Sequence, residues 1–441
     1  MINEKLYRDP VHDLIALDKN SRDDVTLMEL IDTPEVQRLR RIRQMGLAYL
    51  TYQGAEHSRF NHSLGAMWTA TRILDQLNKD QPIPPEMQFA TRCAALLHDV
   101  GHGPLSHVFE SFMAVSHEDW TRRVILDERT GVNRVLRQHH ASLPGEVASI
   151  IEGHSKPRFL SQIIASQLDA DRFDYLLRDS QMTGVKYGIY DFERLLHVLR
   201  LDSVGDNIIV AGNGIQAVEK YLQARYHMYS QVYLHKTVRA GERVFGNLLR
   251  RASHLTDMQE VLRLWEDDPL VVLLRDKADT DLLTFLEIDD ATIQSALKRW
   301  AGSDDPILAD LSRRIVGRKL FKTLDVSKVD HLEERCEEAR EVVRSAGYDP
   351  EYYFIVDTSG DVPYKPYDAR KPGGSSHITI ERGGRRKDIH EVSEVVAGLV
   401  RAAFTVKRAI FPARGNGLDL RQEMSRIFLS DDTRDDFLGG Y

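Results

Sequence analysis

The sequence predicts a mainly α-helical protein that ends in a small α+β lobe. Up to about residue 316, apolar side chains recur at helical spacing. Beyond that point, short runs rich in β-branched and aromatic residues alternate with two helical stretches. We expect strands at 319–326, 352–357, 377–381 and 404–411. We therefore divide the chain into a helical core, residues 1–317, and a C-terminal lobe, residues 318–441.

Composition excludes several classes of protein. The 441 residues suffice for a large core and more than one domain. A net charge of −8 argues against a nucleic-acid binder that relies on overall basic charge. Two cysteines, Cys93 and Cys336, imply a reducing compartment without a disulfide framework. The first residues lack an apolar signal region, and no apolar run is long enough to span a bilayer. We expect a cytoplasmic protein that binds neither membranes nor nucleic acid.

A short stretch, residues 93–107, is the predicted centre of function. An apolar run ends at the doublet His98-Asp99, and Gly101 then breaks the helix, so the doublet should lie at the edge of a cleft. Imidazole and carboxylate ligands suit Mn, Fe, Co, Ni or Zn, and Mg less well. So many polar groups beside an apolar core exceed what a structural role needs, because unpaired burial is costly. The group comprises His62, His98, Asp99, His102, His107 and His117.

Two later segments read as helices with polar residues on one face. In the first, residues 159–178, Asp171 and Tyr175 lie one turn apart, and Asp179 follows at the same spacing. The second runs from residue 215 past residue 238, and two cations flank two aromatic rings on one face, a pattern that suits a phosphate-and-base ligand. These four are Arg225, Tyr229, Tyr233 and Lys236. Solvated polar faces and snorkelling basic side chains are the alternative interpretations.

At this point the motifs resemble a known family. His62, then His98-Asp99, then Asp171 reproduce the H…HD…D signature of HD-domain metal-dependent phosphohydrolases. Segments 32–40, 57–65, 98–107 and 169–175 resemble the SAM-and-HD-domain deoxynucleotide triphosphohydrolases and their bacterial dGTPase-like relatives. The resemblance extends from about Lys5 to Lys322, without a SAM domain. It implies an HD-domain helical core, often in a homotetramer, that splits a dNTP into deoxynucleoside and triphosphate.

The resemblance also implies roles for individual residues. The divalent metal (Mn, Fe, Mg, Co, Ni or Zn) would be bound by His62, His98, Asp99 and Asp171. The triphosphate would be held by Arg59, His102, His107, Arg172, Tyr175 and Arg225. His117, next to Glu118, would transfer a proton near the α-phosphate, and His102 and Glu118 would belong to the same catalytic group. Gln44 and Asp179 would meet the 3′-hydroxyl, and Met45 and Tyr233 would crowd the 2′ side. Arg172 stands where the family has lysine, and Met45 where it usually has leucine.

A guanine-nucleotide effector site between subunits is a further implication of the resemblance. Its positions match Lys5, Asp32, Gln37, Arg40, Arg318 and Lys322, and Arg194 matches a contact to a second effector nucleotide. Here GTP or dGTP would activate the enzyme by favouring the assembled state. The alternative interpretation is an ion-pair network at a subunit contact.

Two other functions are compatible with the metal ligands. An HD phosphodiesterase or phosphohydrolase acting on a cyclic nucleotide or an alarmone would not need Arg225, Tyr233 and Gln44. A non-catalytic nucleotide sensor would be expected to lose a metal ligand, and the sequence retains all of them.

Overall fold

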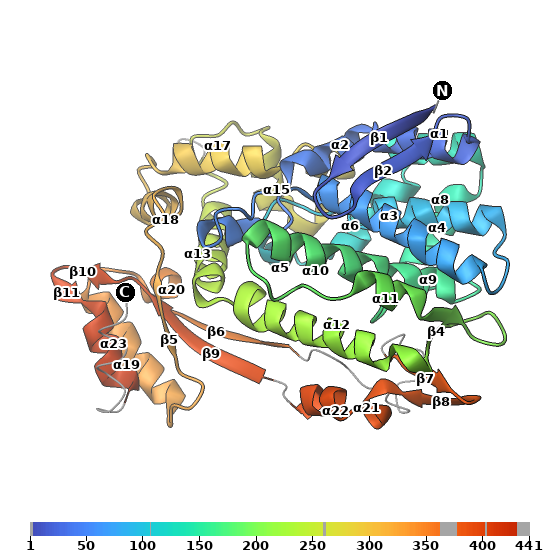
Figure 1. Cartoon of the computed structure of the whole chain (residues 1–441). Coiled ribbons are helices and arrows are strands. Elements are labelled where there is room, and N and C mark those ends of the chain that lie inside the picture. Colours follow the sequence, from blue (N-terminus) through green and yellow to red (C-terminus); the bar gives the residue numbers. More distant parts are fainter. Residues whose placement is uncertain (1–2, 106, 259–261, 362–376, 402–403, 430–441) are drawn as a thin grey trace.

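The computed structural model describes residues 3–105, 107–258, 262–361, 377–401 and 404–429 (Figure 1). The fold is mainly α-helical with short sheets, which confirms the predicted class. Among the described residues, the helices include none whose length and apolar character would let it cross a bilayer.

Three packed helices form the centre of the core (Figure 1): α3 (Arg59–Asn78), α4 (Pro85–Leu97) and α10 (Ala170–Thr183). Pro85 begins α4, where its missing N–H costs nothing. Gly184 ends α10 with a φ of 78°, a conformation that glycine adopts without steric cost. Because these three helices also carry the predicted metal ligands, the packing of the core sets the geometry of the site.

Further helices surround this centre. In the first half of the chain these are α1 (Arg22–Ile31), α2 (Pro34–Arg38), α5 (His107–Met113), α6 (His117–Leu126), α7 (Gly131–His139), α8 (Leu143–Ile151), α9 (Phe159–Ile164) and α11 (Phe192–His197). Later come α12 (Ile215–Met228), α13 (Lys236–His254), α15 (Pro269–Asp276), α16 (Leu282–Leu286), α17 (Asp290–Trp300) and α18 (Pro306–Val316).

The single helix predicted over residues 159–178 is wrong, because the structure divides it into α9 and α10. Asp169 causes the break. Its carboxylate accepts hydrogen bonds from the backbone N–H groups of Ser166 and Arg172, each at 2.7 Å. Such a side chain competes with the helical hydrogen bonds before it and caps the helix after it. The break places Asp171 in the first turn of α10.

The helix predicted from residue 215 past residue 238 is also interrupted. After α12 the chain forms a π-helical turn, Tyr229–Tyr233, and α13 then begins at Lys236. His235 caps α13, with Nδ1 accepting from the N–H of Thr237 at 3.2 Å. A π turn shifts the register of side chains and is frequent at functional sites. The alignment of Lys236 with the preceding aromatic rings is therefore wrong.

The N-terminal residues form a hairpin of β1 (Glu4–Asp9) and β2 (Asp13–Asp18). Its turn is held by Asp9, whose Oδ1 accepts from the N–H groups of Val11 at 2.8 Å and His12 at 3.0 Å. The hairpin thereby directs Asp9 and His12 toward α10, where both side chains are buried.

The C-terminal lobe contains an antiparallel sheet in the order β5 (Lys322–Asp325), β9 (Phe404–Phe411), β6 (Ile355–Asp361). These strands confirm three of the four predicted segments. β6 starts three residues late because a helical turn, α20 (Pro350–Tyr353), capped by Asp349, precedes it. Helices α19 (Leu332–Ser345) and α23 (Leu420–Phe428) pack together beside this sheet (Figure 1). A short pair of strands, β10 (Arg414–Gly415) and β11 (Leu418–Asp419), precedes α23.

A second sheet joins the two parts of the chain. Its order is β3 (Leu199–Leu201), β4 (Ile208–Ala211), β7 (Thr379–Arg382), β8 (Arg385–Asp388), and β7 confirms the remaining predicted strand. Val210 of β4 pairs in parallel with Ile380 of β7. After α21 (Ile389–Val392), helix α22 (Glu394–Arg401) packs on α12 below the core (Figure 1). The division at residue 318 stays a prediction, since residues beyond it return to the core.

Candidate metal centre and nucleotide pocket

The four predicted metal ligands converge from three helices. His62 comes from the first turn of α3, His98 and Asp99 follow the end of α4, and Asp171 lies in the first turn of α10. His62 Nε2 lies 3.3 Å from His98 Nε2 and 3.1 Å from Asp171 Oδ1. His98 Nε2 lies 3.5 Å from Asp99 Oδ1 and 3.7 Å from Asp171 Oδ1. Ligands about 2.0–2.2 Å from one ion have separations of this order.

Both histidines offer Nε2 because the other ring nitrogen is already bonded. His62 Nδ1 lies 2.8 Å from Asp174 Oδ2, and His98 Nδ1 lies 2.8 Å from the carbonyl oxygen of Ala95. Each acceptor fixes the tautomer with its proton on Nδ1 and leaves the Nε2 lone pair toward the site. Two imidazoles and two carboxylates fit a first-row divalent ion. The residues present therefore suit the metal that the sequence predicts.

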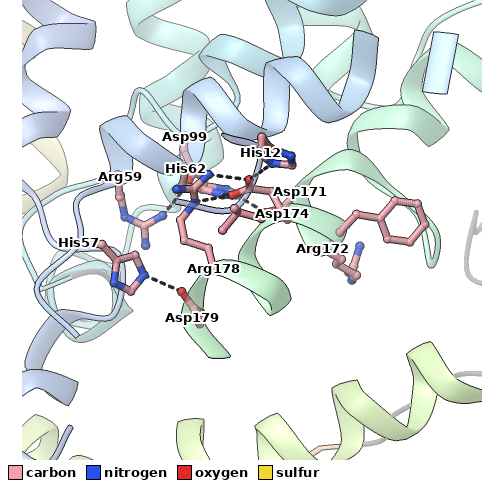
Figure 2. Close-up of polar contacts among 12 residues, drawn as sticks. His12, His57, Arg59, His62, Asp99, Asp171, Arg172, Asp174, Arg178 and Asp179 are labelled. Atoms are coloured by element: carbon pink, nitrogen blue, oxygen red, sulfur yellow. Dashed lines mark hydrogen bonds and ion pairs between the residues drawn. The ribbon is translucent and has the colours of Figure 1, made fainter. Parts of the chain in front are cut away.

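A buried charge network fixes His62 (Figure 2). Asp174 is bonded to His62, to His12 Nε2 at 2.7 Å, and to two nitrogens of Arg178 at 2.8 Å. Arg178 also donates to the two oxygens of Asp9 at 2.8 and 3.2 Å. Burial alone would raise the pKa of Asp174, but Arg178, His12 and His62 hold it well below its usual value. Sequence reasoning missed this network, although Asp171, Asp174 and Arg178 show helical spacing.

A second group of side chains surrounds Asp99. Arg59 Nη1 forms an ion pair with Asp99 Oδ2, and His102 Nε2 lies 3.3 Å from Oδ1. The ring of His102 stacks on that of His117 with centroids 3.9 Å apart. Burial and the charge of Arg59 hold the pKa of His102 well below its usual value, so its ring is neutral.

The acidic partner of His117 is Glu110 and not the predicted Glu118. Glu110 Oε1 lies 3.0 Å from His117 Nδ1 and accepts from the His117 backbone N–H at 2.8 Å. Glu118 is exposed on α6. On α6, residues 117 and 118 point in different directions, whereas α5 brings Glu110 against the ring. Sequence adjacency therefore selected the wrong carboxylate.

A cavity of about 970 Å³ extends from the metal centre. Among its walls are ten of the predicted site residues: Gln44, Met45, Arg59, Asp99, His102, His117, Asp171, Tyr175, Asp179 and Tyr233. Tyr233 donates to Asp179 Oδ2 at 2.8 Å, and His57 Nε2 lies 2.7 Å from Asp179 Oδ1. Within the described part of the chain, Gln44 Oε1 is buried without a hydrogen-bond partner.

Two predicted phosphate-binding arginines are directed to other partners. Arg172 contacts Asp169 and the carbonyl oxygen of Ser166, and it lies apart from the metal ligands (Figure 2). Arg225 Nη1 donates to Gln167 Oε1 at 2.7 Å, with its guanidinium 5.6 Å from the ring centre of Tyr229. His107 begins α5, and its side chain lies outside the described part of the structure. Substrate binding by these three residues stays a prediction.

Four predicted effector residues gather around Tyr7 on β1 and the adjoining helices. Lys5 Nζ lies 5.7 Å from the ring centre of Tyr7, and the pKa of Tyr7 is raised by burial and by the charge of Asp32, with Arg40 opposing. Arg40 Nε donates to Gln37 Oε1 at 2.8 Å. The remaining three lie on other elements: Arg318 bonds the carbonyl of Leu50, Lys322 begins β5, and Arg194 on α11 bonds the carbonyl of Asn213.

Comparison with known proteins gives a consistent result. Residues 59–179 match the HD domain, and residues 190–282 match the HD associated region. The uncharacterized protein YwfO of Bacillus subtilis is 37% identical over 418 residues, which cover 93% of this chain and 92% of that protein. A crystal structure of a phosphohydrolase from Bacteroides thetaiotaomicron superposes with a TM-score of 0.79 at 30% identity, covering 92% of this chain and 99% of that one.

Relatives whose names state an activity are more distant. The deoxynucleoside triphosphate triphosphohydrolase SAMHD1 homolog of Dictyostelium discoideum is 29% identical over 68% of this chain and 57% of that protein. The SAMHD1 protein of Bos taurus is 31% identical over 56% of this chain and 46% of that protein. The chain thus spans about half the length of these two relatives.

Gly65 offers the first test of the buried network. A Cβ at this position would lie 1.9 Å from Asp174 Oδ1 and 2.3 Å from Arg178 Nη2. Because disrupting a buried ion pair costs roughly 3–5 kcal/mol, we expect Gly65→Ala to lower the free energy of unfolding by about that amount. We also expect Mn²⁺ affinity, measured calorimetrically, to fall at least about tenfold as His62 loses its support.

Gly145→Ala on α8 is the matched control, because no atom lies within 4 Å of its added Cβ. It should leave Mn²⁺ binding unchanged and gain up to about 1 kcal/mol of helix propensity. Equal stability of the two variants in chemical denaturation would contradict the close approach of α3 and α10.

The second prediction concerns protons displaced by the metal. Burial opposes the charged form of His62, but Asp171 and Asp174 outweigh it and raise the pKa of His62 to about 10. Without metal, His62 therefore carries a proton at pH 8, and an ion must displace it. Below this pKa, proton competition weakens with rising pH, so we expect Mn²⁺ affinity to rise about tenfold per pH unit from pH 7 to 9.

Calorimetry in two buffers of different ionisation enthalpy measures this proton directly. At least about one proton should be released per ion bound at pH 8. An affinity independent of pH over this range would show that His62 is neutral before the metal binds.

Proposed function

Because the chain belongs to the HD-domain phosphohydrolase family, we propose that it is a metal-dependent deoxynucleoside triphosphate triphosphohydrolase. It would convert a dNTP and water into a deoxynucleoside and inorganic triphosphate. One observation carries this proposal: a single cavity is lined by two of the candidate metal ligands, Asp99 and Asp171, by the His102–His117 pair and by the Tyr233–Asp179 pair. The names of the SAMHD1 relatives support the same reaction.

The reaction needs attack by water on the α-phosphorus and departure of the sugar 5′-oxygen with a proton. A bound divalent metal would supply Lewis-acid stabilisation of phosphate charge. Arg59, which lines the cavity beside Asp99, would offset charge on the phosphate oxygens. The water oxygen forms the new bond to phosphorus and gives up one proton to solvent. The bond from phosphorus to the 5′-oxygen breaks, and a proton donated by the protein completes the deoxynucleoside.

His117 is the proposed donor of that proton. Glu110 accepts from Nδ1–H and orients the ring. His102 stacks on His117 and is neutral, so it does not repel the charged ring. A stacked neutral imidazole and a carboxylate on Nδ1 thus favour proton transfer from Nε2 of His117.

Sugar selection is proposed for the other wall of the cavity. Gln44 presents a buried carbonyl oxygen that has no partner within the described structure, and Asp179 already binds the hydroxyl of Tyr233. These acceptors suit a 3′-hydroxyl. Met45 and Tyr233 would leave a 2′-hydroxyl buried without a partner, which costs about 1–3 kcal/mol. The site should therefore prefer deoxynucleotides.

One observation favours an alternative, a phosphohydrolase acting on a cyclic nucleotide or an alarmone. Arg172 and Arg225, predicted to hold a triphosphate, are bonded to Asp169 and Gln167. A substrate with fewer phosphates in the cavity would not require them.

A nucleotide panel decides between these functions. We expect the Mn²⁺-loaded protein to release intact triphosphate from dNTPs, with kcat/KM at least about tenfold higher for dATP than for ATP. Anion-exchange chromatography of the products measures this.

Asp171→Ala should abolish metal binding and turnover together, because Asp171 completes the ligand set. Asp75→Ala, which removes an exposed carboxylate from α3, is the matched control. Full turnover by a folded Asp171→Ala protein, or exclusive cleavage of a cyclic nucleotide or alarmone, would refute the proposal.

We further infer that GTP or dGTP binds the exposed patch formed by Lys5, Asp32, Gln37 and Arg40 and favours a homotetramer. Asp32 can accept a hydrogen bond from the edge of a guanine base, and Arg40 can offset phosphate charge.

We expect either nucleotide to increase assembly in sedimentation experiments and to raise the rate of dATP hydrolysis. Arg40→Ala should lose both responses, and Arg344→Ala, which removes an exposed arginine of α19, should keep them. If neither nucleotide changes assembly or rate in the wild type, the patch is structural.

A further inference from the structure

The cavity continues well beyond the metal centre. Its far wall is formed by one face of α13, by Lys277 and by residues 355–358 of β6. The volume of about 970 Å³ lies near the upper end of the range of about 300–1,000 Å³ typical of small-molecule pockets. The catalytic groups occupy one end only. The space therefore accommodates a second chemical group at the other end.

The far end is basic. Four cationic side chains line it, and only two carboxylates do, so positive charge is in excess. The cations are Arg239, Arg243, Arg250 and Lys277, and the carboxylates are Glu242 and Asp357. The walls also include apolar side chains: Leu105, Val108, Phe112, Val232 and Val238. The cavity is thus lined by candidate metal ligands, by apolar side chains and by a basic group.

A buried carboxylate orients two of these cations. Asp357 on β6 is 1% exposed. It accepts from Arg239 at 2.8 and 3.1 Å and from Arg243 Nε at 2.6 Å. One carboxylate shared by two guanidinium groups positions both and neutralises only one charge. Arg243, whose side chain is 42% exposed, keeps its terminal N–H groups available for an anion.

The other two cations have no carboxylate partner within the described residues. Arg250 Nη2 donates to the carbonyl of Glu351 at 2.7 Å, while its Nε is buried without a hydrogen-bond partner in that part of the chain. Lys277 Nζ lies 5.4 Å from the ring centre of Phe112, which itself lines the cavity. A buried donor without an acceptor is costly, and an anion in the cavity would remove that cost.

We propose that the basic end is a second binding site that takes a polyphosphate anion. This inference deepens the proposed function, which supplies two sources of the same chemistry: the triphosphate released by the reaction, and the phosphate chain of a second nucleotide. Guanidinium forks bind such oxygens in pairs, and the lysine adds a compact charge. The site combines α13 of the core with β6 of the C-terminal lobe, so an anion bound there links the two parts of the chain.

The test isolates the basic end in the full chain. In an Asp171→Ala background with EDTA, calorimetry with inorganic tripolyphosphate, dATP and deoxyadenosine reports binding without metal. Adding Arg250→Ala and Lys277→Ala should weaken tripolyphosphate binding at least about tenfold, since two charge-assisted contacts are lost. Lys298→Ala with Arg299→Ala, an exposed pair on α17, removes the same charge and should change affinity less than about twofold.

The results show whether the basic end binds polyphosphate and whether that anion is the product or a nucleotide. Unchanged tripolyphosphate affinity in the Arg250→Ala, Lys277→Ala protein overturns it, and so does equal weakening by the α17 pair. Binding of dATP that depends on Arg250 and Lys277 identifies a nucleotide as a source, whereas dependence for tripolyphosphate alone identifies the product. Deoxyadenosine should show no dependence on either cation.

A single variant and the wild-type reaction complete the test. If the double variant does not fold, Lys277→Ala alone, a substitution of an exposed side chain, should weaken tripolyphosphate binding at least about threefold, and no change overturns the proposal. If the wild type releases no triphosphate from dNTPs but binds tripolyphosphate through Arg250 and Lys277, the proposed function fails while the site stands.

Discussion

The buried ion pair between Asp174 and Arg178 is the interaction on which the site depends. Both side chains are fully buried, so neither charge can lose its partner without a cost of roughly 3–5 kcal/mol. Because Asp174 also binds Nδ1 of His62, the orientation of a candidate metal ligand is tied to a pair that the fold itself requires. Gly65 provides the space for this pair between α3 and α10. The separation of the two helices is therefore set by charge as well as by apolar packing.

The same network makes the N-terminal hairpin part of the support of the metal centre. His12 binds Asp174 and thus reaches His62 through that one carboxylate, whereas Asp9 reaches it through Arg178 and then Asp174. The hairpin also carries Lys5, which belongs to the exposed patch that contains Arg40. A ligand on that patch would thus contact an element that is hydrogen-bonded to the network around His62. Such a ligand can change the metal centre only if it binds two arrangements of the site with different affinity.

Sequence reasoning predicted which residues gather at the candidate metal centre but not the residues that support them. His62, His98, Asp99 and Asp171 were identifiable because their residue types and order carry the chemistry. Glu110 was missed because it reaches His117 across the junction of α5 and α6, and adjacency favoured Glu118. The two long helices were predicted as continuous because apolar periodicity does not register a capping side chain such as Asp169 or a π turn. Long-range partners such as Asp9 leave no local pattern.

The charges along the cavity give its two ends different requirements. At the metal end, the carboxylates of Asp99 and Asp171 face Arg59 and, without metal, the protonated ring of His62, so their charges largely cancel. A bound cation would give that end a positive charge that attracts phosphate. At the basic end, cations exceed carboxylates, and phosphate is attracted without a metal. On the proposed function, a bound metal would draw a nucleotide's phosphates to the catalytic end, whereas without metal the basic end would hold them.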